Sequence, residues 1–123
     1  MTLRCALTFD FDAMSLWIGS YQSRNPSMIS RGEFGAVAVP RILDLLKKHG
    51  LAASFFIPGH TALAYPDLVR RIHGEGHEIG HHGWVHENPV DFDEAGERAN
   101  IDRGLEALAK AANVTPKGYR SPA

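Results

Sequence analysis

The stretch Ile79-Gly80-His81-His82-Gly83-Trp84-Val85-His86 places three histidines directly after an apolar segment. On a continuous strand, His82 and His86 would lie roughly 13 Å apart, too far to share an ion. In a helical turn, residues four apart have Cβ atoms about 5–6 Å apart, so their imidazole nitrogens can converge. The spacing therefore favours a helical turn that binds a divalent metal. A histidine-rich surface loop is the alternative interpretation.

Strand-like and helix-like segments alternate on both sides of this stretch. Short apolar runs bounded by turn residues predict four strands, over Leu3–Phe9, Leu51–Ile57, Glu75–Gly80 and Pro116–Arg120. Helical spacing of apolar residues predicts three helices, over Ala36–His49, over Tyr65–His73 and from Asp91 or Asp93 to about Asn113. Residues 13–35 lack a sustained period and are expected to form a loop that covers a site. This order predicts an α/β fold of parallel strands joined by right-handed crossovers.

Polar side chains follow the carboxyl end of every predicted strand. They are Asp10 and Asp12 after the first strand, His60 after the second, His82 and His86 after the third, and Arg120 after the fourth, at its carboxyl end. In parallel α/β folds, ligands bind beyond the carboxyl ends of the strands. Because four strand ends agree, the sequence predicts a functional site at this edge of the sheet. His49, His73 and His77 are instead expected at the surface, and His81 is expected to line the loop.

Composition limits the class of protein. The chain has 123 residues, of which 44% are hydrophobic, and a formal net charge of −1, so we expect one domain and no nucleic-acid or membrane partner. The single cysteine, Cys5, excludes an intrachain disulfide and is expected to be buried in an apolar run. The start of the chain resembles neither a signal peptide nor a transmembrane span, which favours a cytoplasmic location.

Two histidines and one carboxylate would form a three-ligand site for zinc or a similar ion, with a position left for water. Asp10 and Asp12 would project from the same side of an extended segment about 6.6 Å apart, which is unfavourable unless a cation or base lies between them. One carboxylate could bind the metal while the other acts as a general base, held ionised by Arg120. The alternatives are a solvated turn for the aspartates and a surface ion pair for Arg120.

Three motifs resemble those of the polysaccharide deacetylases, carbohydrate esterase family 4, which share the NodB homology domain. Thr8-Phe9-Asp10-Phe11-Asp12-Ala13 resembles the first motif, residues 76–86 resemble the second and residues 118–122 the third, while residues 54–59 are similar to the family's second strand. The resemblance implies a distorted (β/α) barrel of about seven strands. Residues 1–123 would form an incomplete, N-terminal part of that NodB-like domain, for which self-association into a homo-oligomer is plausible.

The resemblance also implies roles for individual residues. Asp12, His82 and His86 would hold a divalent metal, for which zinc is expected, Asp10 would be the catalytic base and Arg120 would orient it. The family's general acid is a histidine that would lie beyond Ala123. Within this chain, His60 is only a weak candidate for that role.

The sequence departs from the common family pattern at three positions. Phe11 separates the two aspartates and Ala13 replaces a glycine, a form similar to a cytoplasmic subgroup of peptidoglycan-deacetylase-like proteins and cofactor-independent allantoinases. Gly83 stands where the family usually has a serine or threonine that supports the metal loop. We therefore predict a metal-dependent hydrolase of non-peptide carbon–nitrogen bonds that acts on an N-acetylated sugar. The alternatives are hydrolysis of a small cyclic amide or imide, and a non-catalytic metal- or carbohydrate-binding module.

Overall fold

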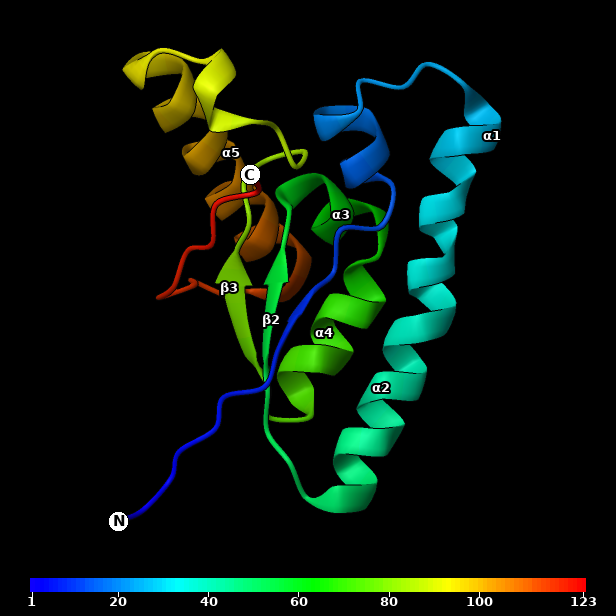
Figure 1. Ribbon diagram of the computed structural model, residues 1–123, viewed down its shortest axis with the longest axis vertical. Helices are drawn as coiled ribbons and strands as arrows, with labels where there is room; N and C mark the ends of the chain where they lie inside the picture. Colours follow the sequence, from blue (N-terminus) through cyan, green and yellow to red (C-terminus); the bar gives the residue numbers. More distant parts are fainter.

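The computed structural model describes residues 1–123, and its centre is a sheet of three parallel strands (Figure 1). The strands are β1 (Thr8–Asp10), β2 (Ser54–Ile57) and β3 (Glu78–His81), in the order β1-β2-β3. Asp10 pairs with Phe56, and Phe56 pairs with Gly80. The carboxyl ends of all three strands therefore lie at one edge.

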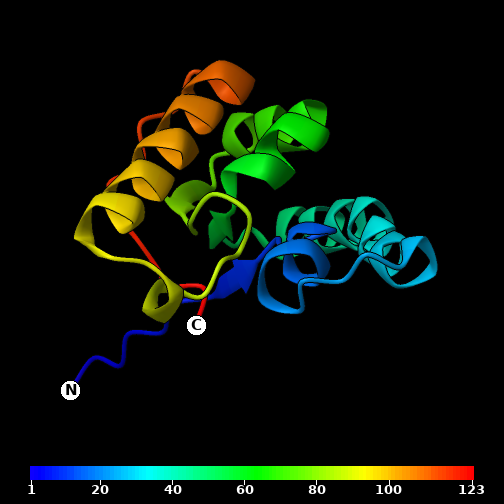
Figure 2. The ribbon, with the colours of Figure 1, turned by 90° about the horizontal axis from the view of Figure 1, so that it is seen from above.

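Helices cover one side of the sheet (Figure 2). The α-helices are α1 (Pro26–Ile29), α2 (Gly35–His49), α3 (Gly59–Ala64), α4 (Pro66–Gly74) and α5 (Glu94–Ala112). Because these helices lie on one side, the sheet has a covered face and an open face. None of the helices combines the length and apolar character needed to cross a membrane.

The core lies between the sheet and these helices. In β2, Phe55 and Ile57 are fully buried, whereas the alternate residues Ser54 and Phe56 are half-buried on the opposite face. The helices contribute further buried apolar side chains, among them Val39, Leu43, Leu46, Val69, Ile72, Leu108 and Ala111. Because the side chains alternate, Asp10, which is in register with Phe56, lies on the open face.

The three long helices predicted from apolar periodicity are confirmed as α2, α4 and α5. Asp93, one of the two predicted caps, is the N-cap of α5, and its Oδ1 accepts the Gly96 N–H at 2.8 Å. The predicted strands two and three are confirmed as β2 and β3, both of which begin three residues later than expected.

The fourth predicted strand is wrong. Residues around Tyr119 form only one parallel bridge, to His81, through His81 N–H to Gly118 O at 2.8 Å and Arg120 N–H to His81 O at 3.0 Å. The ladder stops there because the chain leaves β3 after His81. The first strand is also shorter than predicted, since β2 begins at Ser54 and offers no partner to the residues before Leu7.

Residues 13–35 are not the irregular loop expected from the sequence. They form a π-helical turn η1 (Leu16–Ser20), the short helix α1, and a 3₁₀ helix η2 (Ser30–Phe34) that continues into α2. The sequence analysis also missed α3 and the 3₁₀ turn η3 (Pro89–Asp91). All of these are too short to show a helical period.

Two predictions of burial are wrong. Cys5 is exposed, because the segment that contains it does not join the sheet. His77 is buried rather than at the surface, and its Nδ1 accepts the Ala53 N–H at 3.3 Å. This hydrogen bond joins residues that precede two neighbouring strands, so it cannot be predicted from the local sequence around His77.

We predict that Ala13→Gly stabilises the fold. Ala13 has φ 48°, the left-handed region that is costly for a residue with a Cβ. The free energy of unfolding should rise by about 0.5–1 kcal/mol, once the extra entropy of a glycine in the unfolded chain is deducted. Urea denaturation measures this. Ala109→Gly, at an exposed position inside α5, is the matched control and should lower stability by about 1 kcal/mol.

Candidate functional site

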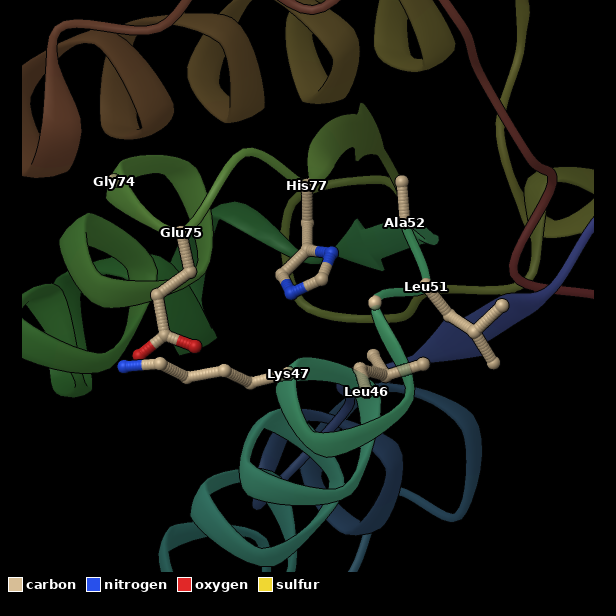
Figure 3. Close-up of a pocket in the computed structure, with 8 residues that line it drawn as sticks. Leu46, Lys47, Leu51, Ala52, Gly74, Glu75 and His77 are labelled. Atoms are coloured by element: carbon tan, nitrogen blue, oxygen red, sulfur yellow. The ribbon is translucent and has the colours of Figure 1, made fainter.

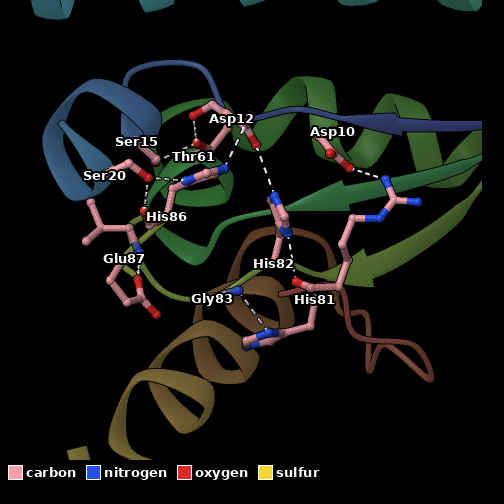
Figure 4. Close-up of polar contacts among 12 residues, drawn as sticks. Asp10, Asp12, Ser15, Ser20, Thr61, His81, His82, Gly83, His86 and Glu87 are labelled. Carbon is pink, nitrogen blue, oxygen red and sulfur yellow. Dashed lines mark hydrogen bonds and ion pairs between the residues drawn. The ribbon is translucent and has the colours of Figure 1, made fainter. Parts of the chain in front are cut away.

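Asp12, His82 and His86 converge beyond the carboxyl ends of β1 and β3 (Figure 4). Asp12 Oδ1 lies 3.5 Å from His82 Nε2, and Asp12 Oδ2 lies 3.5 Å from His86 Nε2. One candidate ligand atom from each residue lies within 4.8 Å of the other two. The structure therefore brings together the three residues that the sequence analysis named as metal ligands.

The two histidines meet in a loop and not in the helical turn that their spacing favoured. Residues 82–88 form no helix, and their path reverses at Gly83 (φ 76°) and again at His86 (φ 60°). The left-handed conformation at these two positions folds the loop back on itself. The imidazole rings consequently lie edge to face, with centroids 4.8 Å apart.

Backbone contacts fix the ring of His82. Its Nδ1 lies 2.8 Å from the carbonyl oxygen of Arg120. A carbonyl can only accept a hydrogen bond, so Nδ1 carries the hydrogen and Nε2 has a free lone pair. That lone pair faces Asp12 from a fully buried ring.

A serine fixes the ring of His86. The Ser20 hydroxyl donates to the backbone oxygen of His86 at 2.8 Å, and its oxygen lies 2.7 Å from His86 Nδ1. Because the single hydroxyl hydrogen is used for the carbonyl, Nδ1–H must donate to Ser20. His86 Nε2 is therefore also left with a free lone pair toward Asp12.

The resulting cluster contains acceptor atoms only. Asp12 Oδ1 and His82 Nε2 are buried and have no hydrogen-bond partner, although they face each other. Burial raises the pKa of the Asp12 carboxyl, an effect that the nearby His86 and His82 only partly offset and to which Asp10 adds. A divalent cation among these atoms would satisfy all of them, so the residues fit a metal ion.

A buried pair of hydroxyls holds the backbone of Asp12. The Thr61 hydroxyl donates to Asp12 O at 2.6 Å, and the N–H of Ser15 donates to the same oxygen at 2.9 Å. The hydroxyls of Ser15 and Thr61 lie 2.7 Å apart, and both side chains are fully buried. The sequence analysis missed both residues, because hydroxyl residues are common and nothing in their spacing indicates a shared carbonyl.

Asp10 and Arg120 form an ion pair on the open face of the sheet. Arg120 Nη1 donates to Asp10 Oδ1, and Nη2 lies 3.0 Å from Thr8 Oγ1. The guanidinium lies 4.1 Å above the Phe56 ring, which supports its path across the sheet. The Arg120 side chain is 35% exposed and that of Asp10 is 37% exposed, so the pair is open to solvent. Contacts with Asp10, Thr8 and Phe56 hold the guanidinium in place.

His60 and His81 lie near the cluster without facing Asp12. His60 Nδ1 lies 3.1 Å from the Ser15 hydroxyl, and burial lowers the His60 pKa, which makes it a poor proton donor at neutral pH. His81 Nε2–H donates to Ile101 O at 2.9 Å and its Nδ1 accepts the Gly83 N–H at 3.1 Å. Burial also lowers the His81 pKa. His81 is the last residue of β3 and not part of the loop, and its two hydrogen bonds tie the start of the loop to α5.

One cavity lies away from this cluster. It measures about 490 Å³ and lies near the amino ends of β2 and β3, where its lining includes Lys47, Ala52, Glu75 and His77 (Figure 3). Asp12, His82 and His86, at the opposite ends of the strands, do not line this cavity.

Comparison with known proteins identifies the family. Residues 5–123 match the sequence profile of the polysaccharide deacetylases. The chain belongs to the polysaccharide deacetylase family. A peptidoglycan deacetylase from Helicobacter pylori is 38% identical over 115 residues, which cover 92% of this chain and 39% of that protein.

Two solved structures support the same assignment. A Mycobacterium smegmatis protein classed as a polysaccharide deacetylase is 41% identical, with a TM-score of 0.87 over 95% of this chain and 42% of that one. A family 4 carbohydrate esterase from Streptomyces lividans, solved with acetate, is 27% identical, with a TM-score of 0.70 over 95% of this chain and 50% of that one. The predicted fold class, part of the deacetylase (β/α) barrel, is confirmed. This chain spans two fifths to one half of the length of these relatives.

We predict that Asp12→Asn does not weaken this deacetylase-family fold when metal is removed. At pH 8 with a chelator, the free energy of unfolding should stay the same or rise by about 1 kcal/mol, because an amide N–H can donate to a histidine nitrogen that now faces only carboxylate lone pairs. Urea denaturation measures this, with the exposed Asp102→Asn as control. A clear loss of stability would show that the carboxylate is satisfied without a cation.

Proposed function

We propose that this chain forms the metal-binding part of a hydrolase that removes acetyl groups from an N-acetylated glycan. One observation carries the proposal: three free lone-pair atoms of Asp12, His82 and His86 converge beside a second carboxylate, Asp10, that an arginine holds. A structural zinc site would be closed by four protein ligands, whereas three ligands leave room for water and substrate. The arrangement is therefore suited to catalysis.

The ligand set supports zinc or a similar divalent ion. Two imidazoles and one carboxylate are a combination found at catalytic zinc sites. An ion bound there would polarise the amide carbonyl and lower the pKa of a nearby water molecule. The hydrogen bonds from His82 to Arg120 O and from His86 to Ser20 keep both Nε2 atoms free for this role.

Asp10 is placed to act as the general base. Its Oδ1 accepts a hydrogen bond from Arg120, while Oδ2 remains free to take a proton from the attacking water. The guanidinium, held over Phe56, orients this carboxylate. Asp10 is also close enough to Asp12 for its charge to raise the Asp12 pKa.

The names of the relatives support a cell-wall glycan as the substrate class. The Helicobacter pylori relative is named a peptidoglycan deacetylase, and one from Bacillus cereus, 41% identical over 83 residues, is named a peptidoglycan-N-acetylglucosamine deacetylase. The second candidate substrate is a small cyclic amide or imide, which the spaced arrangement of Asp10 and Asp12 favours. Both substrates present an amide carbonyl, so the same residues serve either reaction.

Metal binding is the first test. We expect the purified protein to bind zinc in calorimetric titration, and Asp12→Ala and His86→Ala to abolish measurable binding, since each removes one of three ligands. His49→Ala, at the exposed end of α2, should bind zinc like the wild type. Unchanged zinc affinity in Asp12→Ala and His86→Ala would remove this site from the proposal.

Substrate and base are tested together. We expect the complete zinc-loaded hydrolase to release acetate from oligomers of N-acetylglucosamine, and Asp10→Asn to lower its kcat about a hundredfold or more while zinc affinity is retained. The exposed Asp91→Asn is the control. Ring opening of a cyclic imide without acetate release would establish the second candidate instead. Full activity in Asp10→Asn would exclude Asp10 as the base.

A further inference from the structure

The loop that carries His86 is closed by the side chain of Glu87. The Glu87 carboxylate accepts the N–H of Trp84 at 3.0 and 3.1 Å and the N–H of Val85 at 2.7 Å (Figure 4). Glu87 itself is only 9% exposed. A carboxylate that receives several backbone N–H groups in a buried setting makes strong, charge-assisted hydrogen bonds. The loop thus has an internal polar support.

Gly83 and Glu87 depend on each other. Gly83 has φ 76°, and a Cβ at this position would lie 2.8 Å from Glu87 Oε1. A serine or threonine here would be strained and would displace the carboxylate. The glycine at this point of the motif therefore accompanies a different support for the loop, supplied four residues later by Glu87.

The turn η1 supports the loop from the other side. At Gly19 the backbone approaches so closely that a Cβ would lie 1.9 Å from Val85 O. This contact places Ser20 beside His86, where its hydroxyl binds both the backbone oxygen and Nδ1. His86 has φ 60°, a costly conformation for a residue other than glycine, so it requires support of this kind.

We propose that Ser20 and Glu87 are positioning residues that together present His86 Nε2 to Asp12. Glu87 fixes the backbone that leads into His86, and Ser20 fixes its left-handed conformation and its Nδ1–H tautomer. Both act through His86, because neither is among the three clustered residues. This inference rests on the proposed metal site for its effect on zinc affinity, but its effect on the tautomer does not depend on zinc.

The first experiment uses Ser20→Ala. ¹⁵N NMR of the metal-free protein should show His86 as the Nδ1–H tautomer in the wild type and as a mixture in Ser20→Ala. The dissociation constant for Zn²⁺, measured by calorimetry, should rise 10–100-fold. Ser20→Thr keeps the hydroxyl and should restore both readouts. Ser27→Ala, the same change at an exposed serine, should alter neither.

The second experiment uses Glu87→Gln and Glu87→Ala. Gln keeps one acceptor oxygen, so its dissociation constant for Zn²⁺ should lie between those of the wild type and Glu87→Ala, which we expect to be raised 10–100-fold. Glu106→Ala, at an exposed position on α5, is the control. If Glu87→Ala does not fold, Glu87→Gln still decides the outcome.

Two results would overturn the inference: a His86 tautomer that is unchanged in Ser20→Ala, or wild-type zinc affinity in both Ser20→Ala and Glu87→Gln. Failure of the proposed function gives a different pattern. In that case the wild type binds no zinc, and the NMR comparison alone confirms or rejects the role of Ser20.

Discussion

The candidate site is organised around one electrostatic constraint, the meeting of three atoms of Asp12, His82 and His86 that can only accept hydrogen bonds. Such atoms repel one another unless a proton or a cation lies between them, and here two of them are buried without a partner. Three sets of hydrogen bonds hold this arrangement in place. The two imidazoles give their hydrogens to Arg120 O and Ser20, and buried hydroxyls fix the backbone of Asp12. The fold thus maintains a locally unfavourable cluster that a divalent ion would stabilise.

Arg120 links the two halves of the site. Its backbone oxygen accepts from His82, whereas its guanidinium crosses Phe56 to reach Asp10. Its own position is set by the single bridge between His81 and Tyr119, through which Arg120 N–H donates to His81 O at 3.0 Å. A segment that fails to form a strand therefore couples the proposed base to a proposed ligand. Any displacement of this segment would disturb the Asp10 carboxylate and the His82 ring at once.

Sequence periodicity predicted the elements that are long enough to display it. α2, α4 and α5 each bury one apolar stripe over several turns, and Asp93 is an ordinary N-cap, so local rules sufficed. Periodicity did not predict α3 or the short helices between residues 13 and 35, because one or two turns are too short to show a helical period. The histidine spacing pointed to the two residues that the structure brings beside Asp12, but it favoured the wrong backbone conformation. A loop that reverses at Gly83 can bring residues four apart as close together as a helical turn does.

The sequence alone was enough to predict the family, the parallel α/β order and five polar residues that gather at the carboxyl ends of the strands: Asp10, Asp12, His82, His86 and Arg120. These features reside in local patterns and short motifs, which the chain displays whatever its partners in space. Only the tertiary structure decided which histidine nitrogens are free, how Arg120 reaches Asp10, and that Ser20 and Glu87 support His86. The contact between Ser20 and His86 joins residues 66 positions apart and depends on how η1 packs against the loop after β3. The contacts of Glu87 with Trp84 and Val85 are short in sequence, but they form in a loop that reverses at Gly83. No local pattern predicts that η1 packs against this loop. Serine and glutamate are common at protein surfaces, so their presence in the sequence does not indicate a role. Only the fold shows that Ser20 lies beside an imidazole and Glu87 beside two backbone N–H groups.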